Sequence, residues 1–102
     1  MLEIIKKRCG IASAIQVYDE DINLYIEDCK ADLISSGVPS ALIEEPTPGV
    51  ITAVTLYVKA YLGDDRTDTE KYLDLYRKKV FRLSLEEAEV APVQPEEVGD
   101  VE

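Results

Sequence analysis

Histidine and tryptophan are absent from this sequence, and phenylalanine occurs once. Without imidazole the chain lacks the commonest transition-metal ligand and the usual general base near neutral pH. No stretch approaches the roughly 20 apolar residues that span a bilayer, and no apolar run of signal-peptide length follows the basic residues near the N-terminus. We therefore expect a protein that is made in the cytosol and binds no metal, cofactor or membrane.

The motifs of common enzyme classes are missing as well. The sequence contains no G-x-x-x-x-G-K-[ST], G-x-G-x-x-G or H-E-x-x-H, and its serines have no histidine to activate them, although a Ser–Lys pair stays open. The densest acidic cluster comprises Asp64, Asp65, Asp68 and Glu70, and it does not match the spacing of a calcium loop. Helix capping accounts for acids at this turn. We expect no enzymatic activity.

The two cysteines, Cys9 and Cys29, are too few for the disulfide framework of a small secreted domain. Each falls on the apolar phase of an expected helix, where a free thiol behaves as a small buried hydrophobe. Both are predicted to be unpaired.

Negative charge predominates and is unevenly distributed along the chain. The 21 acidic and 11 basic residues give a net charge of -10, which disfavours a conventional nucleic-acid reader. Residues 1–85 carry every basic residue and a net charge of −3, whereas residues 86–102 carry seven acids and no base. We interpret residues 1–85 as one helical domain and residues 86–102 as a disordered acidic tail. The tail is either a solubilising segment or a partner-binding one, with Val90, Val93 and Val98 as candidate contacts.

Helical periodicity dominates the first 85 residues and predicts an all-α fold, a small antiparallel bundle of about four helices. A short helix from Leu2 ends near Gly10, and a second begins with Asp19 as its cap and ends at Gly37. Residues 38–48 are expected to form a loop with a short turn through 41–43. A third helix, capped by Thr47, is apolar around most of its circumference, which predicts a central position; a buried strand over 50–58 is the alternative.

The last helix is expected to begin with a capping box formed by Thr67 and Glu70 and to end near Leu85. Its apolar side is predicted to consist of Tyr72, Leu73, Tyr76, Val80, Phe81 and Leu83. Its basic residues gather near the C-terminal end, where they favour the helix dipole.

Two charged surfaces are candidate subunit or partner contacts. The basic one lies on the last helix and comprises Arg77, Lys78, Lys79 and Arg82, and the acidic one lies on the second helix and comprises Glu27, Asp28 and Asp32. Contact between them on neighbouring copies would be head-to-tail, the kind that closes into rings. Both surfaces are otherwise ordinary solvated helix faces.

Several segments resemble the head–tail connector proteins of tailed bacteriophages. The hydrophobic helix is A-V-T-L-Y-V-K-A-Y-L-G over residues 53–63, and it is followed by the acidic pair Asp64-Asp65. The last helix carries Glu70-Lys71-Tyr72 and Tyr76, and then Leu-Ser-Leu at 83–85. The second helix contributes D-C-K-A-D-L at 28–33 and S-G-V at 36–38. This ordered set covers about residues 20–85, and its size and acidity are similar to those of adaptors from Bacillus-type long-tailed phages.

The resemblance implies a structural virion protein, an adaptor or head-completion protein. Such proteins form a ring of about twelve copies under the portal protein after DNA packaging. The ring extends the channel through which double-stranded DNA passes and provides a platform for the stopper and tail. The implied location is the host cytoplasm during assembly and then the head–tail interface of the virion.

Two other classes remain open on the sequence alone. An acidic DNA mimic would use the net charge to occupy a nucleic-acid-binding protein and would array its acids along one surface. A small helical regulatory or interaction module would form a simple two-fold dimer.

Overall fold

The computed structural model describes residues 1–63 and 66–86, which form five α-helices and no strand. The helices are α1 (Leu2–Arg8), α2 (Asp19–Ser35), α3 (Ser40–Glu44), α4 (Pro48–Leu62) and α5 (Arg66–Ser84). The prediction of an all-α fold is confirmed, and the strand alternative for 50–58 is wrong. The extra helix is α3, one and a half turns long, in the segment where only a turn was expected.

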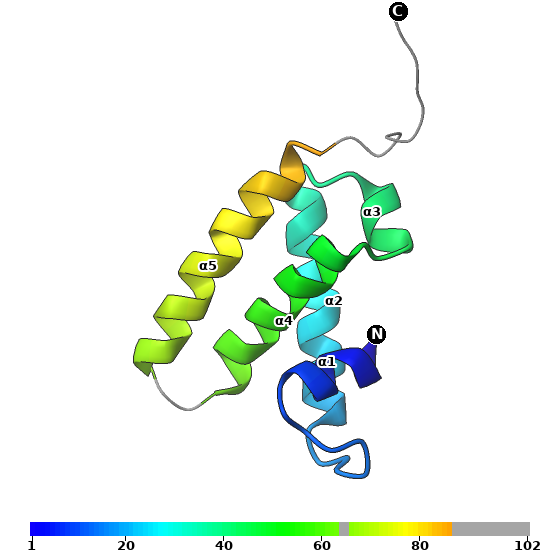
Figure 1. Cartoon of the computed structure of the whole chain (residues 1–102), viewed down its shortest axis with the longest axis vertical. Helices are drawn as coiled ribbons and strands as arrows, with labels where there is room; N and C mark the ends of the chain where they lie inside the picture. Colours follow the sequence, from blue (N-terminus) through cyan, green and yellow to red (C-terminus); the bar gives the residue numbers. More distant parts are fainter. Residues whose placement is uncertain (64–65, 87–102) are drawn as a thin grey trace, which may run out of the picture.

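The centre of the bundle is α4, which lies between α2 and α5 and runs antiparallel to both (Figure 1). Thr47 begins it as predicted: its hydroxyl oxygen accepts a hydrogen bond from the Val50 amide at 3.2 Å, and Pro48 occupies the first helical position. Its buried residues occupy several faces and comprise Val50, Ala53, Val54, Thr55, Val58 and Ala60. The central position predicted for this helix is confirmed.

Glycines end α1 and α2 in the same way. Gly10 and Gly37 have φ angles of 76° and 93°, a region open to glycine. At the end of α2 the amide of Gly37 donates to the carbonyl of Ile34, and the amide of Val38 donates to that of Leu33 at 3.0 Å. These are the two bonds of a Schellman motif, and Val38 is buried beside it. Both helix ends therefore lie where the sequence placed them.

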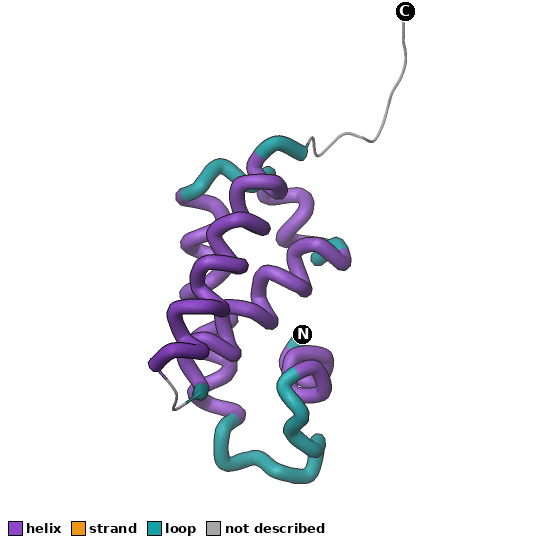
Figure 2. The backbone as a smooth tube through the Cα atoms, turned by 60° about the vertical axis from the view of Figure 1, so that its left-hand side comes forward, coloured by secondary structure: helices purple, strands orange, loops and turns teal. Residues whose placement is uncertain are grey.

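A buried lysine holds α1 and the loop after it against the bundle. The Lys6 side chain is 1% exposed, and its ammonium donates to the carbonyls of Ser13 at 3.1 Å and Ile15 at 2.6 Å. Its third partner is Asp19 Oδ1 at 2.8 Å, in an ion pair rather than a directed hydrogen bond. Lys6 thus joins α1, the 9–18 loop and the start of α2, and α1 lies across the lower part of the bundle (Figure 2).

Two predicted helix caps are wrong. The N-cap of α2 is Tyr18 and no side chain caps it, because the Asp19 carboxylate is drawn to Lys6 instead. The N-terminus of α5 is Arg66, which places Thr67 inside the helix rather than at its cap. Thr69 donates from its hydroxyl to the Ala60 carbonyl at 2.8 Å, and this bond ties the first turn of α5 to the last turn of α4.

The prediction of which α5 residues face the core is correct for most of them and wrong for Phe81. Tyr76, Val80 and Leu83 are buried, but Phe81 is 66% exposed because it lies beyond the arc of α5 that faces α4. Leu83 packs so close to Gly49 of α4 that a Cβ there would lie 3.0 Å from its Cδ2 atom. Apart from Glu86, the predicted tail, including Val90, Val93 and Val98, lies outside the described residues.

Replacing Lys6 with methionine should lower the free energy of unfolding by about 2 kcal/mol, because two carbonyls and the Asp19 carboxylate lose their cation. Urea unfolding followed by circular dichroism measures the change. The matched control is Lys7→Met on the exposed side of α1, which should change stability by less than about 0.5 kcal/mol. Equal effects of the two substitutions would show that Lys6 does not hold the loop.

Candidate functional site

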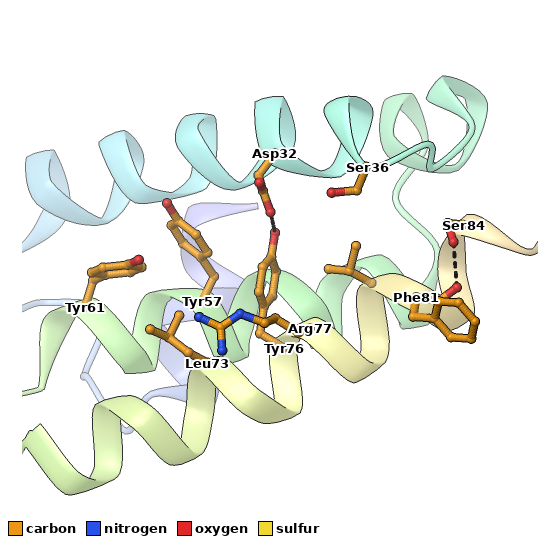
Figure 3. Close-up of a pocket in the computed structure, with 10 residues that line it drawn as sticks. Asp32, Ser36, Tyr57, Tyr61, Leu73, Tyr76, Arg77, Phe81 and Ser84 are labelled. Carbon is orange, nitrogen blue, oxygen red and sulfur yellow. Dashed lines mark hydrogen bonds between the residues drawn. The ribbon is translucent and has the colours of Figure 1, made fainter.

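An open groove runs between α2 and α5, with α4 as its floor (Figure 3). Its volume is about 500 Å³. Side chains from all three helices line it: Asp32 and Ser36 from α2, Tyr57 and Tyr61 from α4, and Leu73, Tyr76, Arg77, Val80, Phe81 and Ser84 from α5. Four of these ten residues are aromatic, and each rim carries a charge, Asp32 on α2 and Arg77 on α5.

Tyr76 spans the groove and links its two rims. Its hydroxyl donates to Asp32 Oδ2 at 2.6 Å (Figure 3). It also accepts a hydrogen bond from Cys29 Sγ at 3.6 Å. Tyr76 is 4% exposed and Cys29 fully buried, whereas Asp32 reaches solvent. The three groups form a chain from the core to the surface that joins α2 to α5 across α4.

Tyrosine rings cover the floor beside this link. Tyr57 meets the Tyr76 ring edge-on at a centroid distance of 5.2 Å and the Tyr61 ring at 4.8 Å. Tyr25 of α2 stacks on Tyr61 at 5.8 Å. Such pairs add stability beyond area burial and favour one rotamer for each ring. The floor of the groove is therefore preorganised.

Burial keeps the groove's weak acids protonated. It raises the pKa of the Cys29 thiol from 9.0 to about 12, against a smaller lowering by the hydrogen bond with Tyr76. It raises the pKa of Tyr57 to about 12, with Tyr61 and Asp28 adding to the effect. Burial, and then the hydrogen bond donated to Asp32, raise the pKa of Tyr76 well above its ordinary range. None of these groups is suited to act as a nucleophile or base near neutral pH.

Both cysteines are unpaired, as predicted. Cys29 lies in the core, but Cys9 is only half-buried because it follows the last residue of α1. Burial also raises the pKa of Cys9, and the charge of Lys59 partly opposes that change.

The predicted basic surface divides into three parts on α5. Arg77 lines both the groove and the outer face of the helix, while Lys78 and Arg82 lie on the outer face and outside the groove. Lys78 pairs with Asp74 one turn earlier at 3.0 Å, and both side chains are exposed. Lys79 is half-buried, with its Cε atom 3.6 Å from the position of a Cβ at Gly49. Among these cations, Lys78 and Arg82 are the exposed ones that do not line the groove.

The predicted acidic surface divides as well. Asp32 accepts the hydrogen bond from Tyr76, and the charge of Asp28 acts on the nearby Tyr57. Glu27, the residue before Asp28, lies about 100° away from it around the axis of α2. It pairs with Lys30 at 3.5 Å. Glu27 and Asp28 are exposed and are not engaged by α5, whereas Asp32 belongs partly to the internal link.

The sequence patterns did not reveal the Tyr76 link or the buried Lys6. Tyr76 was expected simply as an apolar contact and Asp32 as a solvated charge, although a tyrosine and an aspartate on the facing sides of two helices are compatible with a hydrogen bond. In the described part of the chain, no three His, Cys, Asp or Glu side chains gather as metal ligands. No described helix combines the length and apolarity that crossing a bilayer requires.

Raising the pH above about 8.5 should lower the free energy of unfolding, because the unfolded chain releases thiol and phenol protons that the folded chain retains. The stabilisation is present below that pH and declines further above about pH 10, where unfolded tyrosine ionises. Tyr76→Phe should cost about 1 kcal/mol at neutral pH and make the decline above pH 10 shallower. The measurement is urea unfolding across the pH series.

Tyr18→Phe, at an exposed tyrosine, is the control and should retain the wild-type decline. If the Tyr76 and Tyr18 variants decline with the same slope, the buried hydroxyl is not held protonated by the fold.

Comparison with known proteins assigns the chain to a family. Searches of curated proteins and of solved structures find no match. A family model described as "Phage connector protein" matches residues 1–90, which include all five helices and the groove. The resemblance seen in residues 20–85 is thus confirmed and extended to α1. This chain belongs to the phage connector protein family.

Proposed function

We propose that this connector protein is a head–tail adaptor that assembles as a ring of about twelve copies beneath the portal after DNA packaging. The ring extends the DNA channel and forms the platform on which the stopper and then the tail dock. The observation that carries the proposal is the family match over residues 1–90. Assembly begins in the host cytoplasm and ends at the head–tail interface of the virion.

Charge supports a channel role. At a net charge of -10 the chain as a whole repels a polyanion, and the cations on α5 are assigned in this proposal to the contact between subunits. A negative wall repels the DNA backbone at short range and does not retain it, so the duplex slides through without sequence-specific contacts. The DNA-mimic alternative has less support, because a third of the acids lie in the 17 residues after Leu85 rather than along one folded surface.

The subunit contact in this proposal is head-to-tail. Glu27 and Asp28 on α2 of one copy face Lys78 and Arg82 on α5 of the next, since these are the exposed members of the two charged surfaces that do not line the groove. The acids and bases lie on two helices separated by α4 (Figure 1). Such a contact is heterologous and closes into a ring when the rotation per copy permits. Val90, Val93 and Val98 are proposed to contact the portal protein.

Reversing the acids with Glu27→Lys and Asp28→Lys should abolish self-association, because like charges would then meet across the interface. Adding Lys78→Glu and Arg82→Glu to the same chain should restore it, since the pairing is merely inverted. Native mass spectrometry over a concentration series, alone and with the portal protein added, measures the assembly.

The matched control reverses two exposed acids at the C-terminal end of α3, Glu44→Lys and Glu45→Lys, and should assemble like the wild type. Full assembly by the α2 variant, or failure of the fourfold variant to recover, would contradict the proposed contact. A single stable dimer would favour a two-fold helical regulator instead.

A further inference from the structure

The outer face of α5 exposes apolar side chains among cations. Phe81 is 66% exposed, and Leu85, the first residue after the helix, is 67% exposed, although large apolar residues on a monomer surface are usually dispersed. A shallow hollow of about 400 Å³ on this face is lined by Arg77, Lys78, Phe81 and Arg82. This combination of an aromatic ring with three cations suits a segment that carries carboxylates and small apolar side chains.

The chain itself contains such a segment beside this face. The described structure ends at Glu86, two residues after the last residue of α5. Residues 87–102 contain six acids and no base, together with Val90, Val93, Val98 and Val101. Pro92 and Pro95 disfavour helix and suit an extended backbone, which presents side chains along a surface.

The distances allow the segment to fold back. Lys78 lies eight residues before Glu86, which is about 12 Å along a helix. The sixteen residues of the segment, when extended, span roughly 50 Å. The segment can therefore reverse direction after Glu86 and reach Lys78 along α5 with only part of its length. Attachment so close to the face also gives the segment a local concentration in the millimolar range, above that of segments from other copies in dilute solution.

We propose that residues 87–102 dock on the outer face of α5 of their own chain. Their carboxylates pair with Lys78 and Arg82, and their valines cover Phe81. The docked segment occupies the cations that the proposed ring contact uses, so it competes with the neighbouring subunit. It restrains self-association of the free protein until the portal binds the segment. This restraint rests on the proposed function, whereas the docking itself does not.

A tryptophan reporter tests the docking in the full-length chain. Because the chain contains no tryptophan, Val93→Trp introduces a single fluorophore into the segment. Its emission should be blue-shifted, independent of protein concentration, and shifted back to the exposed value by high salt. Adding Lys78→Glu and Arg82→Glu should abolish the blue shift. Adding Lys7→Glu and Arg8→Glu, which make the same charge change on exposed residues of α1, should preserve it.

Amide NMR spectra test the docking in a chain without the tryptophan reporter. In the otherwise native chain, replacing Glu87, Glu89, Glu96 and Glu97 with glutamine should shift the resonances of residues 77–82 and leave those of α1 unchanged. The same variant retains the α5 cations, so it should self-associate at about a tenfold lower concentration than the wild type.

Solvent-exposed emission in the reporter chain, with no change at residues 77–82, would overturn the proposal. A blue shift that grows with protein concentration would overturn it in favour of the segment of a second copy. Docking in a protein that forms no ring with the portal would leave this inference standing and refute the proposed function. Ring formation by a protein whose segment does not dock would refute this inference and leave the proposed function standing.

Discussion

The structure depends on the need to bury α4 on several sides at once. Its apolar residues recur around the helix rather than along one stripe, and a helix of this kind is stable only when neighbours cover it. In response α2 and α5 pack against two different sides of it, and α1 contacts both α4 and α2 (Figure 1). Because α4 separates α2 from α5, a groove remains between them, and Tyr76 bridges it.

Because of this arrangement, residues of the same charge lie in different environments and make different contacts. Lys6 is buried and fastens a loop, whereas Lys78 on the outer face of α5 pairs only with exposed Asp74. Asp32 accepts the hydrogen bond that fixes Tyr76, whereas Glu27 and Asp28 stay on the surface. The subunit contact is proposed on residues that stay on the surface, where Lys78 and Glu27 make only exposed ion pairs within their own helices. Rigid placement by α4 gives these surfaces a constant separation, which a repeating assembly requires.

Periodicity predicted most of the fold because it records which faces are buried. The all-α class, the central helix, the Thr47 cap and the ends at Gly10 and Gly37 each followed from a local pattern. The wrong cap at Asp19 has another cause, because a carboxylate that can cap a helix can also pair with a cation elsewhere, and the choice depends on residues distant in sequence. Asp19 pairs with Lys6, which no local pattern indicates.

The candidate site was less accessible from the sequence than the fold. The charged residues of α2 and α5 were identified, but whether each faces solvent or the groove depends on how the helices are rotated about α4. Asp32 and Lys79 were therefore grouped with residues that the structure separates from them. Phe81 was assigned to the core for the same reason, since the apolar arc of α5 is narrower than its sequence pattern suggests.

The most direct test of the account is negative-stain imaging of the purified protein mixed with the portal protein of its phage. The account predicts a closed ring of about twelve copies stacked coaxially on the portal, with an open channel along the common axis. Unbound monomers or two-fold dimers beside bare portals would contradict it.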